Sequence, residues 1–239
     1  MRSIAIKIGA DEEHPGGPGA VKPDGTFQYI PAPEPDQSVT EPTYAELNLS
    51  GDRPSDAADT VTEMNPVFPE LGHGASYTFG RSASEAAHRI EELQADDVIF
   101  FYARLTYEHD RIPLLASIDI DTGYYLIGQF RLATDPVIVD GKWSIPRSIW
   151  QAFETNALRR RETFDARVLV RGDPVRSGLY ERVLPLDGPN LTPGDCLPKP
   201  SASVIADQPW GNRPIQFDDT VTEHLLLVAA GGRPKRTIV

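Results

Sequence analysis

The sequence has little cysteine, little lysine and no long apolar segment. Its one cysteine, Cys196, excludes an internal disulfide framework and a metal site built from several cysteines. The longest apolar runs, residues 98–103 and 225–230, are six residues each, whereas a membrane-spanning helix needs about 20. The N-terminus turns acidic early and lacks the apolar core of a secretion signal. We therefore expect a cytoplasmic protein that makes no membrane contact.

Acidic side chains dominate the charge of the chain. The 239 residues include 35 acidic and 23 basic side chains, for a formal net charge of -12, and only five of the basic residues are lysine. An Asp-rich, Lys-poor composition resembles that of salt-loving organisms such as halophilic archaea. Because concentrated salt screens like charges beyond a few Å, the negative total says little about partners. A 40% apolar fraction is enough for a core and excludes wholesale disorder.

Several short segments alternate apolar and polar residues or are continuously apolar, which predicts strands. These segments are residues 4–8, 27–30, 98–103, 114–120, 124–132 and 166–171. The spacing of apolar residues predicts helices over 84–93 and 145–158, whereas 221–230 is compatible with a helix or a strand. We expect an α+β fold with a mixed or antiparallel sheet or small open barrel, a few flanking helices and long Pro/Gly-rich loops.

The chain is expected to form one elaborated domain over residues 1–239, since its length suits one large domain and no internal repeat is present. Residues 31–75 are rich in Pro, Asp and Thr and hold few apolar anchors, which predicts a mobile acidic insertion or a functional loop. Residues 187–215 form a second, Pro-rich loop in this interpretation.

One region departs from the acidic background. Residues 142–182 carry nine basic and five acidic side chains, a local net charge of +4, so the rest of the chain carries -16. A local positive zone attracts phosphate even on an acidic protein, and guanidinium groups bind phosphate well. The predicted phosphate-binding or nucleic-acid-binding residues are Asn156, Arg159, Arg160, Arg161 and Arg171. Alternatively, these cations offset the dipole of the predicted helix or dock a partner protein.

The first loop supplies the candidate catalytic residues. Asp11, His14 and Asp24 lie in a Gly-rich stretch, and glycine lets a backbone approach a ligand closely. The five histidines match no metal-binding spacing, so no metal site is predicted and the cofactor stays open. Residues 16–19 lack the spacing of dinucleotide and P-loop motifs, and no Gly-x-Ser-x-Gly elbow is present.

Aromatic residues concentrate around the predicted sheet. Tyr77, Tyr102 and Tyr124 are the candidates for stacking on a base. An aromatic recess beside arginines suits a flipped base or a nucleotide. The alternative is that these rings belong to the core, because alternation along a strand buries about half of its side chains.

Two stretches resemble a known family. The first is residues 6–11, followed by Gly17-Pro18-Gly19 and PDGTFQYIP over 23–31; the second is residues 77–80, 97–103 and 125–128. Together with Asn156-Ala157 and residues 177–179 and 185–186, they resemble the nucleotide modification associated domain 3 family, with Phe79 a departure from the expected tyrosine. The resemblance spans nearly the whole chain. It implies a role alongside DNA or nucleotide base modification, with no settled reaction.

A second resemblance covers residues 93–132, which are similar to the middle of PUA-like barrels such as the EVE and YTH domains. Those domains bind modified bases or RNA through an aromatic pocket. The likeness implies a similar small barrel for this part of the fold.

Three functions remain open from the sequence. The first is a component of a DNA or nucleotide modification system that binds a nucleotide or nucleic acid through the Arg-rich zone and an aromatic pocket. The second is an enzyme of that system, with Asp11, Asp24 or His14 as acid or base on a nucleotide or modified base. The third is a non-enzymatic subunit that contacts other proteins of a modification operon.

Overall fold

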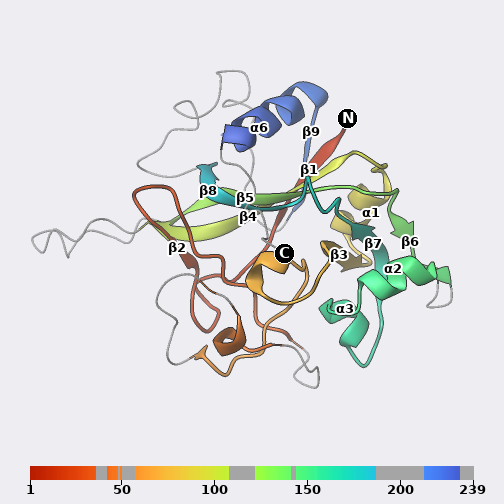
Figure 1. The fold of residues 1–239 in the computed structure, drawn as a ribbon, viewed down its shortest axis with the longest axis horizontal. Helices are drawn as coiled ribbons and strands as arrows, with labels where there is room; N and C mark the ends of the chain where they lie inside the picture. Colours follow the sequence, from red (N-terminus) through yellow and green to blue (C-terminus); the bar gives the residue numbers. More distant parts are fainter. Residues whose placement is uncertain are drawn as a thin grey trace, which may run out of the picture.

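The structure, a computed structural model, describes residues 1–35, 42–47, 49, 57–107, 122–140, 144–186 and 213–231. The strands are β1 (Ser3–Lys7), β2 (Gly19–Val21), β3 (Thr78–Ser82), β4 (Val98–Tyr107), β5 (Thr122–Arg131), β6 (Val137–Ile138), β7 (Ala166–Arg171), β8 (Gly178–Pro185) and β9 (Ile215–Phe217). The helices are η1 (Tyr44–Glu46), η3 (Pro69–Leu71), α1 (Glu85–Glu91), α2 (Arg147–Ala152), α3 (Ala157–Arg160) and α6 (Asp219–Gly231). Sheets with a few flanking helices confirm the predicted α+β class (Figure 1).

The main sheet is mixed and open. Its strands follow the order β8-β5-β4-β1-β9, and β2 also pairs with β4. β1 and β2 both run parallel to β4, whereas the β4–β5, β5–β8 and β1–β9 pairs are antiparallel. Consequently β1 and β2 lie one after the other along the same side of β4, with a loop between them.

The two faces of the main sheet bury different cores because successive side chains of a strand point to opposite faces. On one face, Ala5 and Phe100 pack with Leu225 of α6, and this helix lies across the sheet in Figure 1. On the other face, Phe101 packs with Phe79 of the second sheet, their ring centroids 5.3 Å apart. The main sheet therefore forms a central layer between α6 and the second sheet.

The second sheet is antiparallel and has the strand order β3-β7-β6. It packs against α2 and α3, where Phe153 and Leu158 bury their side chains beside Leu169 of β7. α1 follows β3 directly and is capped by Ser84, whose hydroxyl accepts a hydrogen bond from the Ala87 N–H. This confirms the helix predicted over residues 84–93.

The single helix predicted over 145–158 is wrong, because the chain forms α2 and α3 instead. Between them Asn156 has an extended backbone, with φ -85° and ψ 133°, and its side chain accepts a hydrogen bond from the Leu158 N–H. Asn156 also donates to Asn65 and Thr78, and it is fully buried. These bonds favour the extended conformation over continuation of the helix.

Three further segments for which the sequence was interpreted have different outcomes in the structure. Residues 27–30 do not form the predicted strand, because only Phe27 forms an isolated bridge, with Val21. The segment 221–230, left undecided by its sequence, lies within the helix α6. The predicted strand 114–120 lies outside the described residues.

The described part of residues 31–75 contributes to the core despite its irregular backbone. Phe68 is fully buried, and its ring packs edge-on against Tyr29, Phe101 and Phe130 at centroid distances of 5.3–5.9 Å. The segment therefore has stronger apolar anchors than its composition indicates. Most of the Pro-rich loop 187–215 lies outside the described residues. Within the part of the chain that the structure describes, no helix combines the length and apolar character needed to cross a membrane.

Candidate functional site: a buried polar pocket beside β1

The candidate site lies where β1 ends. β4 pairs with β1 as far as Lys7 and with β2 from Gly19 onward, so the loop 8–18 departs from the sheet between these points. Gly9 has a φ of +90°, and a Cβ at this position would lie 2.9 Å from the ring of Tyr29. Both the left-handed backbone and the close approach require glycine at the residue where the chain turns outward.

Asp11 is held in this loop by one of its two carboxylate oxygens. Its Oδ2 accepts a 2.6 Å hydrogen bond from Lys7 Nζ, and the two side chains are only 18% and 14% exposed. The Asp11 N–H donates to Nδ1 of His14 at 2.8 Å, so this ring nitrogen acts as a hydrogen-bond acceptor. The Oδ1 of Asp11 is buried without a hydrogen-bond partner among the described residues.

Arg81, on β3, supplies a half-buried cation. Its guanidinium carbon lies 5.2 Å from the ring centroid of Phe79. Nε is buried without a partner, and the guanidinium forms no hydrogen bond or ion pair with any other described residue. Burial lowers the pKa of Arg81, whereas the charge of Glu63 raises it. The group stays protonated at neutral pH because a guanidinium titrates so far above that range.

Two buried asparagines fix the backbone next to Arg81. Asn65 accepts a hydrogen bond from the Gly80 N–H at 2.9 Å and donates to the Gly80 carbonyl at 3.0 Å. Asn156 donates to Oδ1 of Asn65 at 3.2 Å. A Cβ on Gly80 would lie 2.6 Å from the Leu158 side chain. The backbone before Arg81 is therefore held by polar bonds on one side and close packing on the other.

Glu63 connects the site to Arg161. The Arg161 guanidinium bonds both oxygens of Glu34 at 2.9 and 3.1 Å, and its Nη2 also donates to Glu63 Oε1 at 3.0 Å. The Glu34 side chain is completely buried. Burial raises the pKa of Glu63 and the charge of Glu34 adds to this effect, while Arg161 and Arg81 act in the opposite direction. The arrangement keeps a second carboxyl group close to Arg81.

These side chains surround a cavity of about 250 Å³, which we name the Asp11 pocket. Its lining residues are Lys7, Ile8, Gly9, Asp11, Glu13, His14, Tyr29, Ala32, Glu63, Asn65 and Arg81. A second cavity of about 250 Å³ adjoins it at Lys7 and Arg81 and extends to Pro214 and the start of α1. Among the described residues, no group of three or more His, Cys, Asp or Glu side chains could hold a metal ion. The lining side chains themselves offer hydrogen bonding, charge and proton transfer.

The structure brings together two of the three predicted catalytic residues. Asp11 and His14 are bonded to each other and line the pocket. Asp24 lies elsewhere, on an exposed turn, where its Oδ1 accepts hydrogen bonds from the N–H and hydroxyl of Thr26. These bonds lower the pKa of Asp24. They also stabilise the turn around Gly25, whose carbonyl accepts a hydrogen bond from the Val183 N–H of β8.

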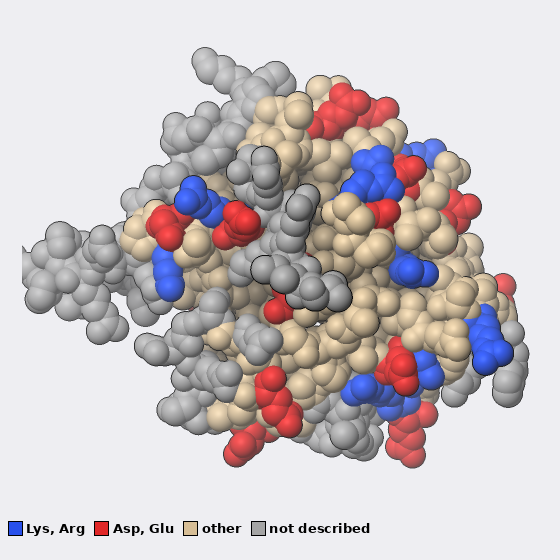
Figure 2. Space-filling model, viewed as in Figure 1, with Lys and Arg blue, Asp and Glu red and all other residues tan. Residues whose placement is uncertain are grey.

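The predicted phosphate-binding residues make internal contacts. Arg159 lies 4.7 Å from the ring centroid of Trp150 and donates to its carbonyl, and Arg160 donates to the Glu154 carbonyl at 3.0 Å. Arg161 pairs with Glu34, and Asn156 is buried, as described above. Arg171 ends β7 and is not part of the pocket lining. On the face shown in Figure 2, described basic and acidic side chains lie close together in small groups rather than in one basic patch.

The three predicted base-stacking tyrosines occupy different environments. Tyr102 is fully buried and packs edge-on against Tyr124 at 5.9 Å. Tyr77 is also buried, with its ring against Phe130 and its hydroxyl bonded to Glu70. Tyr124 is half-buried, and Nζ of Lys7 lies 5.8 Å from its ring centroid. None of the three lines the Asp11 pocket, and Tyr124 is the ring that lies near Lys7 of its lining.

Sequence reasoning missed Lys7, Tyr29, Glu63 and Arg81. Lys7 carried a usable signal, since it is a charged residue at the end of an apolar alternating strand, shortly before a glycine. Tyr29 lies in the PDGTFQYIP string that supports the family resemblance. Glu63 and Arg81 have no comparable local pattern, because only the fold brings them to the loop 8–18.

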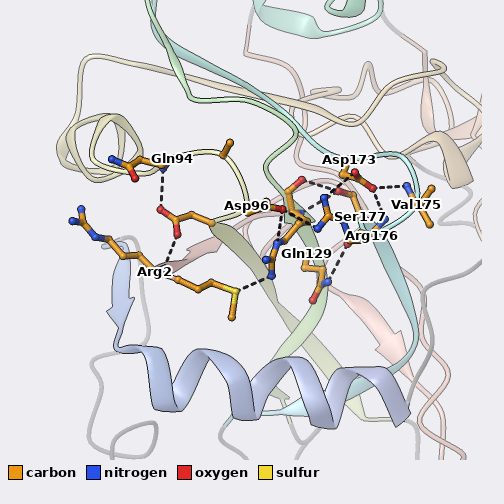
Figure 3. A network of polar contacts seen from close by, with 12 residues as sticks. Arg2, Gln94, Asp96, Gln129, Asp173, Val175, Arg176 and Ser177 are labelled. Carbon is orange, nitrogen blue, oxygen red and sulfur yellow. Dashed lines mark hydrogen bonds and ion pairs between the residues drawn. The ribbon is translucent and has the colours of Figure 1, made fainter.

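A second polar cluster, the Asp96 network, provides a contrast outside the pocket (Figure 3). Asp96 Oδ1 accepts hydrogen bonds from Arg176 at 2.8 Å and Arg131 at 3.4 Å, and Arg176 also bonds Asp173 at 3.1 Å. The hydrogen bonds from Arg176 and Arg131 lower the pKa of Asp96. The charged groups of this network bond one another and link the turn before β4 to β5 and the turn before β8.

The fold and the site define an α+β protein with a polar pocket beside the loop that leaves the main sheet after β1. The chain belongs to the nucleotide modification associated domain 3 family, whose model matches residues 2–217. This match confirms the family resemblance drawn from the sequence, whereas the likeness to PUA-like barrels is not confirmed. No curated protein and no solved structure matches the chain.

Proposed function

We propose that the protein binds a nucleotide in the Asp11 pocket as a component of a nucleotide modification system. Family membership supports the role in a nucleotide modification system, and one observation supports the Asp11 pocket as the binding site. The buried acceptor Asp11 Oδ1 and the buried donor Arg81 Nε lack partners among the described residues, and both residues line the same cavity. A buried polar group without a partner costs about 1–3 kcal/mol. A ligand that bonds both atoms would recover that free energy on binding.

This proposal moves the binding role away from the Arg-rich zone. Arg161 is engaged by Glu34, and Arg159 contacts Trp150 through its charge and a hydrogen bond. Arg81 and Lys7 are the cations at the pocket, and Tyr29 contributes an aromatic wall. The proposal therefore keeps the aromatic pocket expected from the sequence, with Tyr29 in place of the three tyrosines that were predicted to stack on a base.

The alternative is an enzyme of the same system. Asp11 favours it, since its Oδ2 is fixed by Lys7 while its Oδ1 is left to accept a proton from a bound ligand. The step proposed is transfer of a proton from an N–H or O–H of the ligand to Asp11 Oδ1. Mass spectrometry of nucleotides incubated with the protein tests this alternative: a product that the unchanged protein forms and Asp11→Asn does not would support it. Recovery of every nucleotide unchanged would contradict the enzyme alternative and leave nucleotide binding as the proposed function.

Calorimetric titration with nucleotides tests the binding proposal. Arg81→Gln should weaken nucleotide binding at least tenfold, since it removes the cation and its Nε donor. Arg176→Gln is the matched control, because it removes an arginine whose partners, Asp96 and Asp173, lie outside the pocket. Equal binding by the unchanged protein and Arg81→Gln would contradict the proposed site. An equal loss in both variants would contradict it as well.

A further inference from the structure

The charges that line the Asp11 pocket nearly cancel. Its charged residues are two cations and three carboxylates: Lys7, Arg81, Asp11, Glu13 and Glu63. The formal sum counts histidine as neutral, in keeping with the acceptor role of His14 Nδ1. The formal charge of the lining is therefore -1, and the Arg161–Glu34 pair beside Glu63 leaves that sum unchanged. A phosphate dianion would enter surroundings of its own sign, whereas an uncharged group meets no such repulsion.

The unpartnered atoms also differ from those of a phosphate site. Arg81 offers an N–H donor and Asp11 offers a carboxylate acceptor. The edge of a nucleobase carries acceptors and N–H donors side by side, so it offers a partner of each kind. A phosphate dianion carries acceptors alone, and it would leave Asp11 Oδ1 without a donor.

The dimensions of the pocket agree with a base-sized ligand group. Its volume of about 250 Å³ lies below the range of about 300–1,000 Å³ typical of cavities that hold whole drug-sized ligands. The Tyr29 ring lines it and is fixed by an edge-on contact with Phe68 at 5.9 Å. A rigid aromatic wall of this kind suits a planar heterocycle.

We infer that the Asp11 pocket takes the uncharged nucleobase end of its ligand and leaves the phosphate outside. Arg81 donates to an acceptor on the base edge, and Asp11 Oδ1 accepts from a ring N–H or an amino group. This inference rests on the proposed function and adds the part of the nucleotide that the pocket recognises. It also assigns Arg81, which no sequence motif marks, as a base-recognising residue.

Paired titrations of nucleosides and nucleotides test this inference. The probes are the four common deoxynucleosides and ribonucleosides, each compared with its own 5′-monophosphate at low and high salt. We expect at least one nucleoside to bind with an affinity within about threefold of its monophosphate, at both salt concentrations. Arg81→Gln should lower both affinities by the same factor, at least tenfold, while Arg176→Gln lowers neither. Thermal unfolding of each variant verifies that the protein is folded.

The other outcomes separate the two proposals. Monophosphates that bind at least tenfold tighter than their nucleosides, with an affinity that falls as salt rises, would place the phosphate in the pocket. That result overturns the inference and leaves the proposed function standing. Binding of neither nucleosides nor monophosphates would overturn both. Tight nucleoside binding that Arg81→Gln leaves unchanged would overturn the assignment of Arg81.

Discussion

The Asp11 pocket and the Asp96 network both contain arginine and aspartate side chains, but these side chains are paired with one another only in the Asp96 network. In the Asp96 network, exposed Arg176 joins two carboxylates and fastens neighbouring segments of the chain. In the Asp11 pocket, Nε of Arg81 and one oxygen of Asp11 are buried without partners among the described residues. A surface ion pair gains little because water solvates its members well when they separate. A buried group without a partner lowers stability, which supports the proposal that a ligand bonds these two groups.

The contrast between the Asp11 pocket and the Asp96 network bears on where a nucleotide would bind. The chain belongs to a family associated with nucleotide modification, yet the basic zone that the sequence singles out resembles the Asp96 network. Its arginines contact other parts of the protein. The Asp11 pocket, which lies at an acidic loop, holds a buried donor and a buried acceptor that have no partner among the described residues.

The largest expected effect concerns Arg161, where the Arg-rich zone meets the pocket. Arg161→Met leaves the fully buried Glu34 carboxylate without the guanidinium that it faces. We expect the free energy of unfolding to fall by about 3–5 kcal/mol, because removing one member of a buried ion pair strands the other. Chemical denaturation measures this change. Arg176→Met should unfold close to the unchanged protein, and a similar loss in both variants would remove the distinction between the two regions.

Asn156→Ala is expected to have the next largest effect. It removes the cap of α3 and the hydrogen bonds to Asn65 and Thr78, for a loss of about 2 kcal/mol in unfolding free energy. Since Asn65 fixes the backbone next to Arg81, nucleoside affinity should fall as well. Ser84→Ala, which removes the exposed cap of α1, should lower stability less and leave the affinity unchanged. An unchanged affinity in folded Asn156→Ala would show that Asn65 holds its place without this support.

The two regions should respond to pH in opposite directions. Because burial raises the pKa of Glu63 above its ordinary 4.5, the folded state holds this proton more tightly, and stability falls as pH rises through that window. Glu63→Gln should therefore gain stability relative to the unchanged protein as pH rises from about 4.5. Hydrogen bonds from Arg176 and Arg131 lower the pKa of Asp96 below 3.8, so its contribution is present above 3.8 and lost as pH falls.

Urea denaturation of Glu63→Gln and Asp96→Asn across this pH range provides the measurement. The stability of Asp96→Asn relative to the unchanged protein should change only below the ordinary value of 3.8. Parallel pH profiles for the two variants would contradict the difference in environment that the structure gives them.

The smallest effect is expected from Arg159 and Arg160. The double variant Arg159→Gln/Arg160→Gln removes contacts with Trp150 and Glu154, and neither arginine lines the Asp11 pocket. Nucleoside affinity measured by calorimetry should stay within about twofold of the unchanged protein. A tenfold loss would instead return these arginines to the binding site.

The sequence predicted the parts of the fold that depend on local pattern. The strand at residues 4–8 and the helix at 84–93 follow from apolar spacing and a capping serine, and both are present as β1 and α1. The helix over 145–158 failed at Asn156, because its partners Asn65 and Thr78 are distant in sequence. Likewise, Phe68 could not be recognised as a core residue from a segment rich in Pro and Asp.

The same contrast between local patterns and distant partners separates the site residues that the sequence predicted from those that it missed. Asp11 and His14 were recognised because they are three residues apart in one Gly-rich loop. Glu63 and Arg81 come from segments far along the chain, and they reach the pocket through the pairing of Asn65 with Gly80 and the packing of the two sheets. Charge counting favoured the arginine run because it sums residues along the sequence and takes no account of their partners in space.

A crystal structure of the protein with a bound nucleoside monophosphate tests the central claim most directly. We expect an acceptor of the base within about 3.2 Å of Arg81 Nε and a donor of the base at a similar distance from Asp11 Oδ1, with the phosphate outside the pocket. A nucleotide bound at Arg159 and Arg160, with the Asp11 pocket holding no part of it, would contradict the account.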